Sequence, residues 1–280
     1  MNHPAELAIH SFLNKALKGE ASVSSSIADT VAEDVKKAVI RQFAGKREDF
    51  RLRMSNLGRK KCQLWFEKNH PESKEAFPPH FLINMLIGDI IEAVFKGLMR
   101  ASNVKFEDSG VATLQTKHRE IKGEYDMILD NKIDDIKSAS GWSYINKFED
   151  ITTLKKSDAF GYIAQLVGYA KATEKGLGGW WVVNKNTGEF KYVEAENVDT
   201  DEEMAKIEDT IAYIDNDEPF ERCYTDEPEA YYSKPSGNRK LGVECGFCSF
   251  KYKCWENLQA LPSRVSKAKE PPIVYYTHVV

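Results

Sequence analysis

The 280-residue sequence predicts an α+β fold in which helices flank a mixed central β-sheet. Strand-like segments are followed by helical segments, but without the strict alternation that a wholly parallel sheet requires. The composition, 42% hydrophobic and 29% charged residues, is typical of a globular chain with a sizeable core. No apolar run is long enough to span a bilayer, so no membrane partner is expected.

The first half of the chain is expected to be mainly helical. Residues 1–50 predict a polar helical extension that is interrupted by serines at positions 22–26. Ser55 is expected to cap a helix that reaches past Cys62. A long helix over residues 81–99 is apolar on most of its circumference and is therefore expected to be buried.

The second half alternates extended and helical patterns. A helix is expected to begin after Asp158 and to stop at the glycines of residues 176–179. An acidic helical stretch precedes a cysteine-rich segment. These elements predict a core over residues 51–260 and an extended tail over residues 261–280. Strands are expected over residues 111–114, 124–129, 133–136, 180–183 and 190–193, the last two joined as a hairpin.

Charge is distributed unevenly along the sequence. The net charge is −4, yet residues 36–61 contain ten basic and two acidic residues, and residues 194–221 contain twelve acidic residues and one lysine. This separation permits a face that binds phosphates, but two solvated helical faces would have the same pattern. The N-terminus mixes charges of both signs and lacks an export signal, which indicates a reducing compartment where cysteines are ligands or free thiols.

The segment over residues 123–140 contains the residues best suited to chemistry. If Asp130 and Asn131 form a two-residue turn, Asp126 lies opposite Asp135 in the hairpin. Lys137 lies on the same face as Asp135, because side chains on a strand alternate between its two faces. The hairpin would therefore bring two carboxylates and an ammonium group together.

Two carboxylates that face each other on a sheet destabilise it unless a cation lies between them. Mg²⁺ or Mn²⁺ suits a site made only of oxygen ligands. An isolated Asp-x-Lys is common, however, and a solvated hairpin edge would have the same residues.

Two helices supply further polar candidates. Glu92 lies on the apolar face of the helix over residues 81–99, where a carboxylate is costly unless it is paired or binds a metal. A partly exposed glutamate that reaches solvent is the alternative interpretation. Gln165 and Tyr169, one turn apart on the next helix, share a face and could contact a phosphate or a base.

This ordered set of residues resembles the RecB-like branch of the PD-(D/E)XK nuclease superfamily. The resemblance implies a restriction-endonuclease-like core that binds Mg²⁺ or Mn²⁺ and hydrolyses DNA. Glu92 stands where many relatives have histidine. By resemblance, the metal ligands are Glu92, Asp126, Asp135 and the backbone carbonyl of Ile136, Lys137 orients the attacking water, and Gln165 and Tyr169 position the strand.

The cysteines predict a second metal site. Cys245, Cys248 and Cys254 have a C-x2-C-x5-C spacing, and Cys62 is the best candidate for a fourth ligand. This arrangement resembles the iron–sulfur nucleases of the same branch, among them CRISPR-associated RecB-like and AddB-type proteins, and implies a 4Fe–4S cluster. Structural zinc is the alternative, although zinc ribbons more often have two C-x2-C pairs. Cys223 matches no ligand pattern and is expected to be a plain thiol.

The sequence thus predicts a metal-dependent DNA exonuclease of a phage-type or stand-alone kind, acting on single strands or ends. It would act in the cytoplasm of a bacterium or of a phage-infected host cell. Two alternatives share the same residues. One is a CRISPR adaptation nuclease that processes spacers with partner proteins, and the other is a catalytically silent DNA-binding or assembly module.

Overall fold

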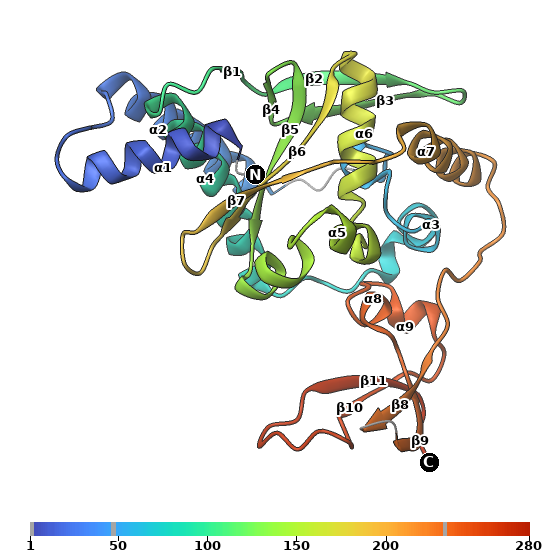
Figure 1. The fold of residues 1–280 in the computed structure, drawn as a ribbon. Helices are drawn as coiled ribbons and strands as arrows, with labels where there is room; N and C mark the ends of the chain where they lie inside the picture. Colours follow the sequence, from blue (N-terminus) through green and yellow to red (C-terminus); the bar gives the residue numbers. More distant parts are fainter. Residues whose placement is uncertain (1–2, 46–48, 232–233) are drawn as a thin grey trace. The chain divides into compact units, whose positions relative to one another are not determined.

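The computed structural model describes residues 3–45, 49–231 and 234–280. The chain forms two compact units, of which the first comprises Met1–Gly58 and Pro78–Asp209 and the second Arg59–Phe77 and Thr210–Val280 (Figure 1). The core expected over residues 51–260 contributes to both units. The expected helical extension belongs to the first unit, and the expected tail belongs to the second.

A mixed five-stranded sheet is the centre of the first unit, as the sequence predicts (Figure 1). The strands lie in the order β1-β4-β5-β6-β7, with β5 and β6 parallel and all other neighbours antiparallel. Their bounds are β1 Phe106–Glu107, β4 Met127–Leu129, β5 Lys132–Ala139, β6 Gly176–Asn184 and β7 Phe190–Glu194. The last pair is the hairpin expected between residues 180 and 193.

Helices flank this sheet. The apolar core joins α1 and α4 to the sheet through buried side chains such as Phe95, Met99, Ile136 and Trp181. Helix α6 packs against β5, β6 and a separate hairpin, β2–β3. The bounds are α1 Pro4–Leu17, α2 Ser25–Phe43, η1 Met54–Asn56, α4 Pro79–Ala101, β2 Gly110–Gln115, β3 Glu120–Tyr125, η3 Ser143–Lys147, α5 Ile151–Ser157, α6 Tyr162–Thr173 and α7 Thr200–Asp215, the last spanning the boundary of the two units.

The turn between β4 and β5 has the predicted two residues. Asp130 and Asn131 both adopt positive φ, 50° and 62°, which is the geometry of a tight hairpin turn. The strands pair with Met127 opposite Asp134, which confirms the predicted register. The ladder ends there, so Asp126 lies in the bend between β3 and β4, one position beyond the last pair.

The prediction that a helix begins at Ser55 is wrong. Residues 54–56 form one 3₁₀ turn, and the following helix α3 begins only at Lys61. Gly58 makes a close backbone approach to Gly161: a Cβ at Gly58 would lie 2.4 Å from the Cα of Gly161. The chain therefore passes directly against another backbone segment here.

The expected burial of the long helix is correct for only half of α4. From Ala93 onward, Phe95 and Met99 pack into the core. Phe81 and Ile83, in the first turns, are exposed. An apolar circumference therefore did not mean burial along the whole helix, because Phe95 and Met99, the fully buried α4 residues of the apolar core, both lie in its C-terminal half.

Helix α6 has the predicted start but a different end. The carboxylate of Asp158 accepts hydrogen bonds from the backbone N–H groups of Tyr162 and Ile163, each 2.9 Å long, and so caps the helix. The helix ends at Glu174, which adopts a left-handed φ of 54°. The glycines over residues 176–179 were expected to stop the helix, but they lie in β6.

One of those glycines, Gly178, accommodates a buried carboxylate, Asp134. A Cβ at Gly178 would lie 1.9 Å from Asp134 Oδ1. Gly179 N and the Tyr192 hydroxyl donate to Oδ1, and Trp181 Nε1 donates to Oδ2, each over 2.9 Å. Burial raises the pKa of Asp134 to about 6, and the three donors limit that rise. Asp134 thus ties β5 to both β6 and β7.

The second unit contains a four-stranded antiparallel sheet in the order β10-β11-β9-β8. Its buried carboxylate, Glu229, accepts hydrogen bonds from the Tyr276 hydroxyl (2.6 Å) and from Asn238 Nδ2 (2.8 Å). The expected extended tail contains one of its strands, β11. The bounds are α3 Lys61–Asn69, η2 Pro71–Ser73, β8 Glu227–Tyr231, β9 Lys234–Lys240, α8 Val243–Gly246, α9 Lys251–Cys254, β10 Gln259–Pro262 and β11 Ile273–His278. Across the described ranges, no helix combines the length and the apolar character that a membrane span requires.

We predict that Asp134→Asn lowers the free energy of unfolding by about 1–3 kcal/mol. In asparagine, an amide NH₂ group replaces one carboxylate oxygen. That NH₂ group would face an N–H or O–H group that now donates a hydrogen bond to Asp134. Urea unfolding of the purified protein measures the change. Asp130→Asn is the matched control, because asparagine tolerates the left-handed turn position, and this control should change stability by less than about 0.5 kcal/mol. Equal stability of Asp134→Asn and the unmodified protein would contradict the prediction.

Candidate active site

Three carboxylates that the sequence singles out lie close together in the first unit. Glu92 comes from α4, Asp126 from the bend between β3 and β4, and Asp135 from β5. Burial raises the pKa of both Glu92 and Asp135, the charge of Asp126 adds to both rises, and the charge of Glu92 adds to that of Asp135. The fold therefore brings together the acidic residues expected from three separate elements.

Asp135 and Lys137 form a buried ion pair. Asp135 is 3% exposed, and Lys137 Nζ lies 2.8 Å from its Oδ1 and 2.6 Å from its Oδ2. Only the contact with Oδ1 has hydrogen-bond geometry, so Oδ2 is a buried carboxylate oxygen without a hydrogen-bond partner.

Burial and the charge of the partner shift the pKa of each member of this pair in opposite directions. Burial raises the pKa of Asp135, and the ammonium group of Lys137 opposes the rise. Burial lowers the pKa of Lys137, but the charges of Asp135 and Asp126 outweigh it, and the pKa is raised overall. Lys137 therefore stays protonated beside the carboxylates.

Asp126 is held directly against the strand that bears Asp135. The backbone N–H of Ile136 donates to Asp126 Oδ2 over 2.8 Å. This bond continues the hairpin contact beyond the end of the ladder, with a side chain in place of a backbone carbonyl. The fixed register of the turn thus sets the position of Asp126 relative to Asp135.

Glu92 has a cationic partner that sequence analysis did not identify. Lys96 Nζ donates to Glu92 Oε1 over 2.7 Å, and Lys96 is buried. Burial raises the pKa of Glu92, and Lys96 opposes that rise. The four-residue spacing of a glutamate and a following lysine on one helix was the available signal.

Gln165 and Tyr169 lie on the same face of α6, as expected, but Tyr169 is buried. Its hydroxyl donates to the backbone carbonyl of Glu124 over 2.6 Å, two residues before Asp126. Burial raises the pKa of Tyr169, and a hydrogen bond with Gln165 opposes the rise. Tyr169 therefore supports the segment that carries Asp126, whereas the partly exposed Gln165 remains accessible.

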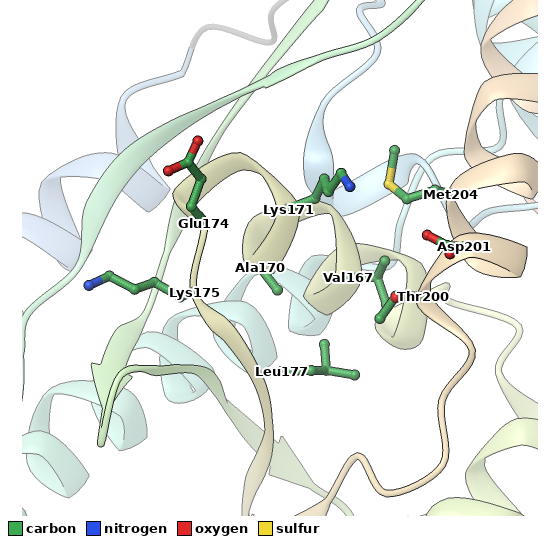
Figure 2. A pocket seen from close by; sticks show the side chains of 9 residues that line it. All are labelled: Val167, Ala170, Lys171, Glu174, Lys175, Leu177, Thr200, Asp201 and Met204. Carbon is green, nitrogen blue, oxygen red and sulfur yellow. The ribbon is translucent and has the colours of Figure 1, made fainter.

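A hollow of about 360 Å³ lies on the opposite face of α6 (Figure 2). Helical spacing places its α6 residues, such as Val167 and Lys171, about half a turn away from Gln165 and Tyr169. None of the candidate catalytic residues lines it. The lining residues are Val167, Ala170, Lys171, Glu174, Lys175, Leu177, Thr200, Asp201 and Met204.

The four predicted cluster ligands all belong to the second unit. Cys62 lies on α3, and Cys245, Cys248 and Cys254 lie on or beside α8 and α9. Burial raises the pKa of Cys245 to about 11, and the charges of Cys248 and Cys254 add to the rise. The charge of Cys248 likewise affects Cys62, which places the four thiols in one neighbourhood.

A fifth thiol, Cys223, joins them, which the expectation of a plain thiol did not foresee. The backbone N–H of Cys62 donates to Cys223 Sγ over 3.2 Å. A hydrogen bond between the two thiols lowers the pKa of Cys223 and raises that of Cys62. The guanidinium of Arg222 donates to the carbonyl of Cys254, which ties this segment to the cysteine-rich segment.

The donor types suit two kinds of metal, but side chains would have to move. Of the residues described, no three His, Cys, Asp or Glu side chains are placed so that they could hold a metal ion as they stand. In the carboxylate group, Lys137 and Lys96 neutralise two of the acids. The oxygen donors, with the orphaned Asp135 Oδ2, fit Mg²⁺ or Mn²⁺, and the thiols fit a softer metal or cluster.

Comparisons with known proteins do not assign a family. No family model matches the chain, and no curated protein is similar to it. A solved structure that aligns with it is the crystal structure of SSO0001, at 16% identity, covering 80% of this chain and 95% of that chain with a TM-score of 0.43. A similarity of this size carries no argument about function.

We predict that Mg²⁺ or Mn²⁺ raises the melting temperature of the protein. An ion present at 100 times its dissociation constant would add about 2.7 kcal/mol to the free energy of unfolding. Because the pKa values of Glu92 and Asp135 are raised, protons compete with the ion as the pH falls, so the shift should be larger at pH 8 than at pH 5.

Differential scanning fluorimetry across this pH range measures the effect. Asp135→Asn should abolish the shift, whereas Glu33→Gln, an exposed acid on α2, should retain it. An equal shift in Asp135→Asn and the unmodified protein would locate ion binding elsewhere.

Proposed function

We propose that this chain is a divalent-metal-dependent deoxyribonuclease that hydrolyses phosphodiester bonds from DNA ends, with a restriction-endonuclease-like core of the RecB-like PD-(D/E)XK kind. One observation carries the proposal. Asp135 has a buried oxygen without a hydrogen bond and contacts Lys137, and the charges of Asp126 and Glu92 add to the rise in its pKa that burial causes. This is the group of residues that the sequence resemblance selects.

The carboxylates favour a cation of higher charge than the ammonium groups now beside them. Three neighbouring acids, two of them with raised pKa values, are incompletely neutralised by Lys137 and Lys96. Asp126, Asp135, Glu92 and the carbonyl of Ile136 would hold Mg²⁺ or Mn²⁺. When bound, such an ion lowers the pKa of water and offsets the negative charge of the reacting phosphate.

The remaining residues have separate roles in this proposal. Lys137, protonated and fixed by Asp135, would orient the attacking water or stabilise developing negative charge, which can contribute a few kcal/mol. Gln165 would contact the strand. Tyr169 would act indirectly, because its hydroxyl already bonds to the backbone beside Asp126.

The thiols of the second unit would bind a 4Fe–4S cluster, with structural zinc as the alternative. Cys62 is separated from Cys245 by most of the sequence, so a metal that joins them constrains a long loop. Metal-binding free energy at such a site adds to the stability of the folded unit.

Cleavage of end-labelled DNA tests the proposed activity. Linear single strands, linear duplex and a closed circle are each incubated with Mg²⁺ or Mn²⁺. We expect the linear DNA to shorten and the circle to survive. Lys137→Ala should reduce the rate by about 100-fold or more, as loss of one charge-stabilising group commonly does. Lys171→Ala, on the opposite face of α6, should cleave normally.

The other outcomes are equally informative. Nicking of the circle would show that the protein is an endonuclease and not an exonuclease. Intact DNA in every reaction, with folded and metal-loaded protein, would contradict the hydrolase and support a DNA-binding or assembly module. Cleavage that Lys137→Ala does not affect would point to a contaminating nuclease.

For the cysteines, we predict that Cys248→Ser loses bound metal and melts at a lower temperature, because one ligand of the proposed site is removed. Cys223→Ser is the matched control and should keep both properties, because Cys223 lies outside the proposed ligand set and a serine oxygen can accept the hydrogen bond that Cys62 N–H donates to its Sγ. Iron, sulfide and zinc analysis of the purified proteins, with thermal melts, measures the effect. Full metal content in Cys248→Ser would remove this residue from the ligand set.

A further inference from the structure

Lys147, at the end of η3, is a buried lysine without an anionic partner. It is 8% exposed, and in the part of the chain that the structure describes no carboxylate forms an ion pair with it. Burial lowers its pKa, and the charge of Asp158 opposes that shift. Burying an ammonium group without an anion is costly, so a ligand that supplies one would be favoured.

Aromatic rings surround this ammonium group. Lys147 Nζ lies 4.5 Å from the ring centroids of both Phe160 and Tyr162 and 6.0 Å from that of Phe148. Such cation–π contacts offset part of the cost of burial but do not replace an anion. Phe160 and Tyr162 stack on each other, with centroids 5.7 Å apart and planes inclined by 21°.

The ring of Tyr162 connects this group to the candidate active site. Lys137 Nζ lies 5.2 Å from the centroid of Tyr162, so both ammonium groups contact one aromatic ring. Tyr162 also begins α6, the helix that carries Gln165. The aromatic group therefore adjoins the residues proposed to act on the scissile phosphate.

Phe160 presents an open aromatic surface at this place. Its side chain is 56% exposed, whereas Phe148 beneath the group is buried. Exposed rings beside cationic side chains are the means by which proteins bind single-stranded nucleic acid, because bases stack on the rings and phosphates pair with the cations. A purely apolar partner would bury Phe160 but leave Lys147 without an anion.

We propose that Phe160, Tyr162 and Lys147 form a binding subsite for one nucleotide of a single strand, next to the scissile phosphate. The base stacks on Phe160, and the phosphate of that nucleotide is neutralised by Lys147. The proposal rests on the proposed nuclease function and specifies its substrate as a single-stranded end. Bases within a duplex are already stacked on their neighbours and do not offer a free face to Phe160.

Fluorescence anisotropy of a labelled oligothymidylate tests this subsite, with Ca²⁺ in place of Mg²⁺ and a gel to verify that the strand stays intact. Phe160→Ala should weaken binding by about tenfold or more, the usual effect of losing one stacked base, and Phe160→Trp should restore it. Phe43→Ala is the matched control, because Phe43 is 53% exposed on α2 and should leave affinity unchanged. Affinity for a blunt duplex should change by less than about twofold in every variant.

Lys147→Met separates a ligand-binding role from a structural one. It should weaken single-strand binding and reduce the slope of log affinity against log salt by about 0.7, the value for one phosphate contact on a single strand. Its melting temperature should be equal to or above that of the unmodified protein, because an unpaired buried charge is removed. Lys147→Arg should retain the affinity.

Failure of the subsite and failure of the nuclease give different results. Single-strand affinity that is absent, or unchanged in both Phe160→Ala and Lys147→Met, overturns the subsite even if the protein cleaves DNA. Loss of affinity in those two variants, in a protein that cuts no DNA with Mg²⁺ or Mn²⁺, supports the subsite and contradicts the nuclease.

Discussion

Strand β5 buries two successive aspartates, and the cost of burying two carboxylates constrains the rest of the first unit. Because side chains alternate along a strand, Asp134 and Asp135 face opposite sides of the sheet. Asp134 accepts three hydrogen bonds from β6 and β7 and holds the sheet together. Among the residues that the structure describes, Asp135 pairs with Lys137 and keeps one oxygen without a hydrogen bond. Asp134 thus has a structural role and Asp135 a proposed chemical one, and glycine is required at position 178 so that Asp134 fits.

The parts of the site that depend on local structure were predictable from the sequence. A two-residue turn at Asp130 and Asn131 determines the register, and the register brings Asp126 to Asp135. Two contacts between distant segments were not predicted. The hydroxyl of Tyr169 could have faced a substrate, but the packing of α6 against β3 directs it to a carbonyl. Cys223 matched no spacing rule, because its contact with Cys62 joins positions 161 residues apart.

We propose two metal chemistries in two separate units of one chain. Oxygen donors and ammonium groups gather in the first unit, and thiols gather in the second. Lysines are important to the first site in different ways. Lys137 and Lys96 neutralise acids, whereas Lys147 lies among aromatic rings and forms no ion pair within the described ranges. A negatively charged substrate would compensate for the buried charge of Lys147. The free energy that burial of this ammonium group costs would then favour substrate binding.

We propose above all that Asp126, Asp135 and Glu92 hold a divalent ion with which DNA is hydrolysed. A crystal structure of the protein soaked with Mn²⁺, with an anomalous difference map, tests it most directly. We expect a peak bound by Asp126 and Asp135, with Lys137 turned away from Asp135 Oδ2. A map without a peak at these carboxylates under saturating Mn²⁺, and with the Asp135–Lys137 pair unchanged, would contradict it.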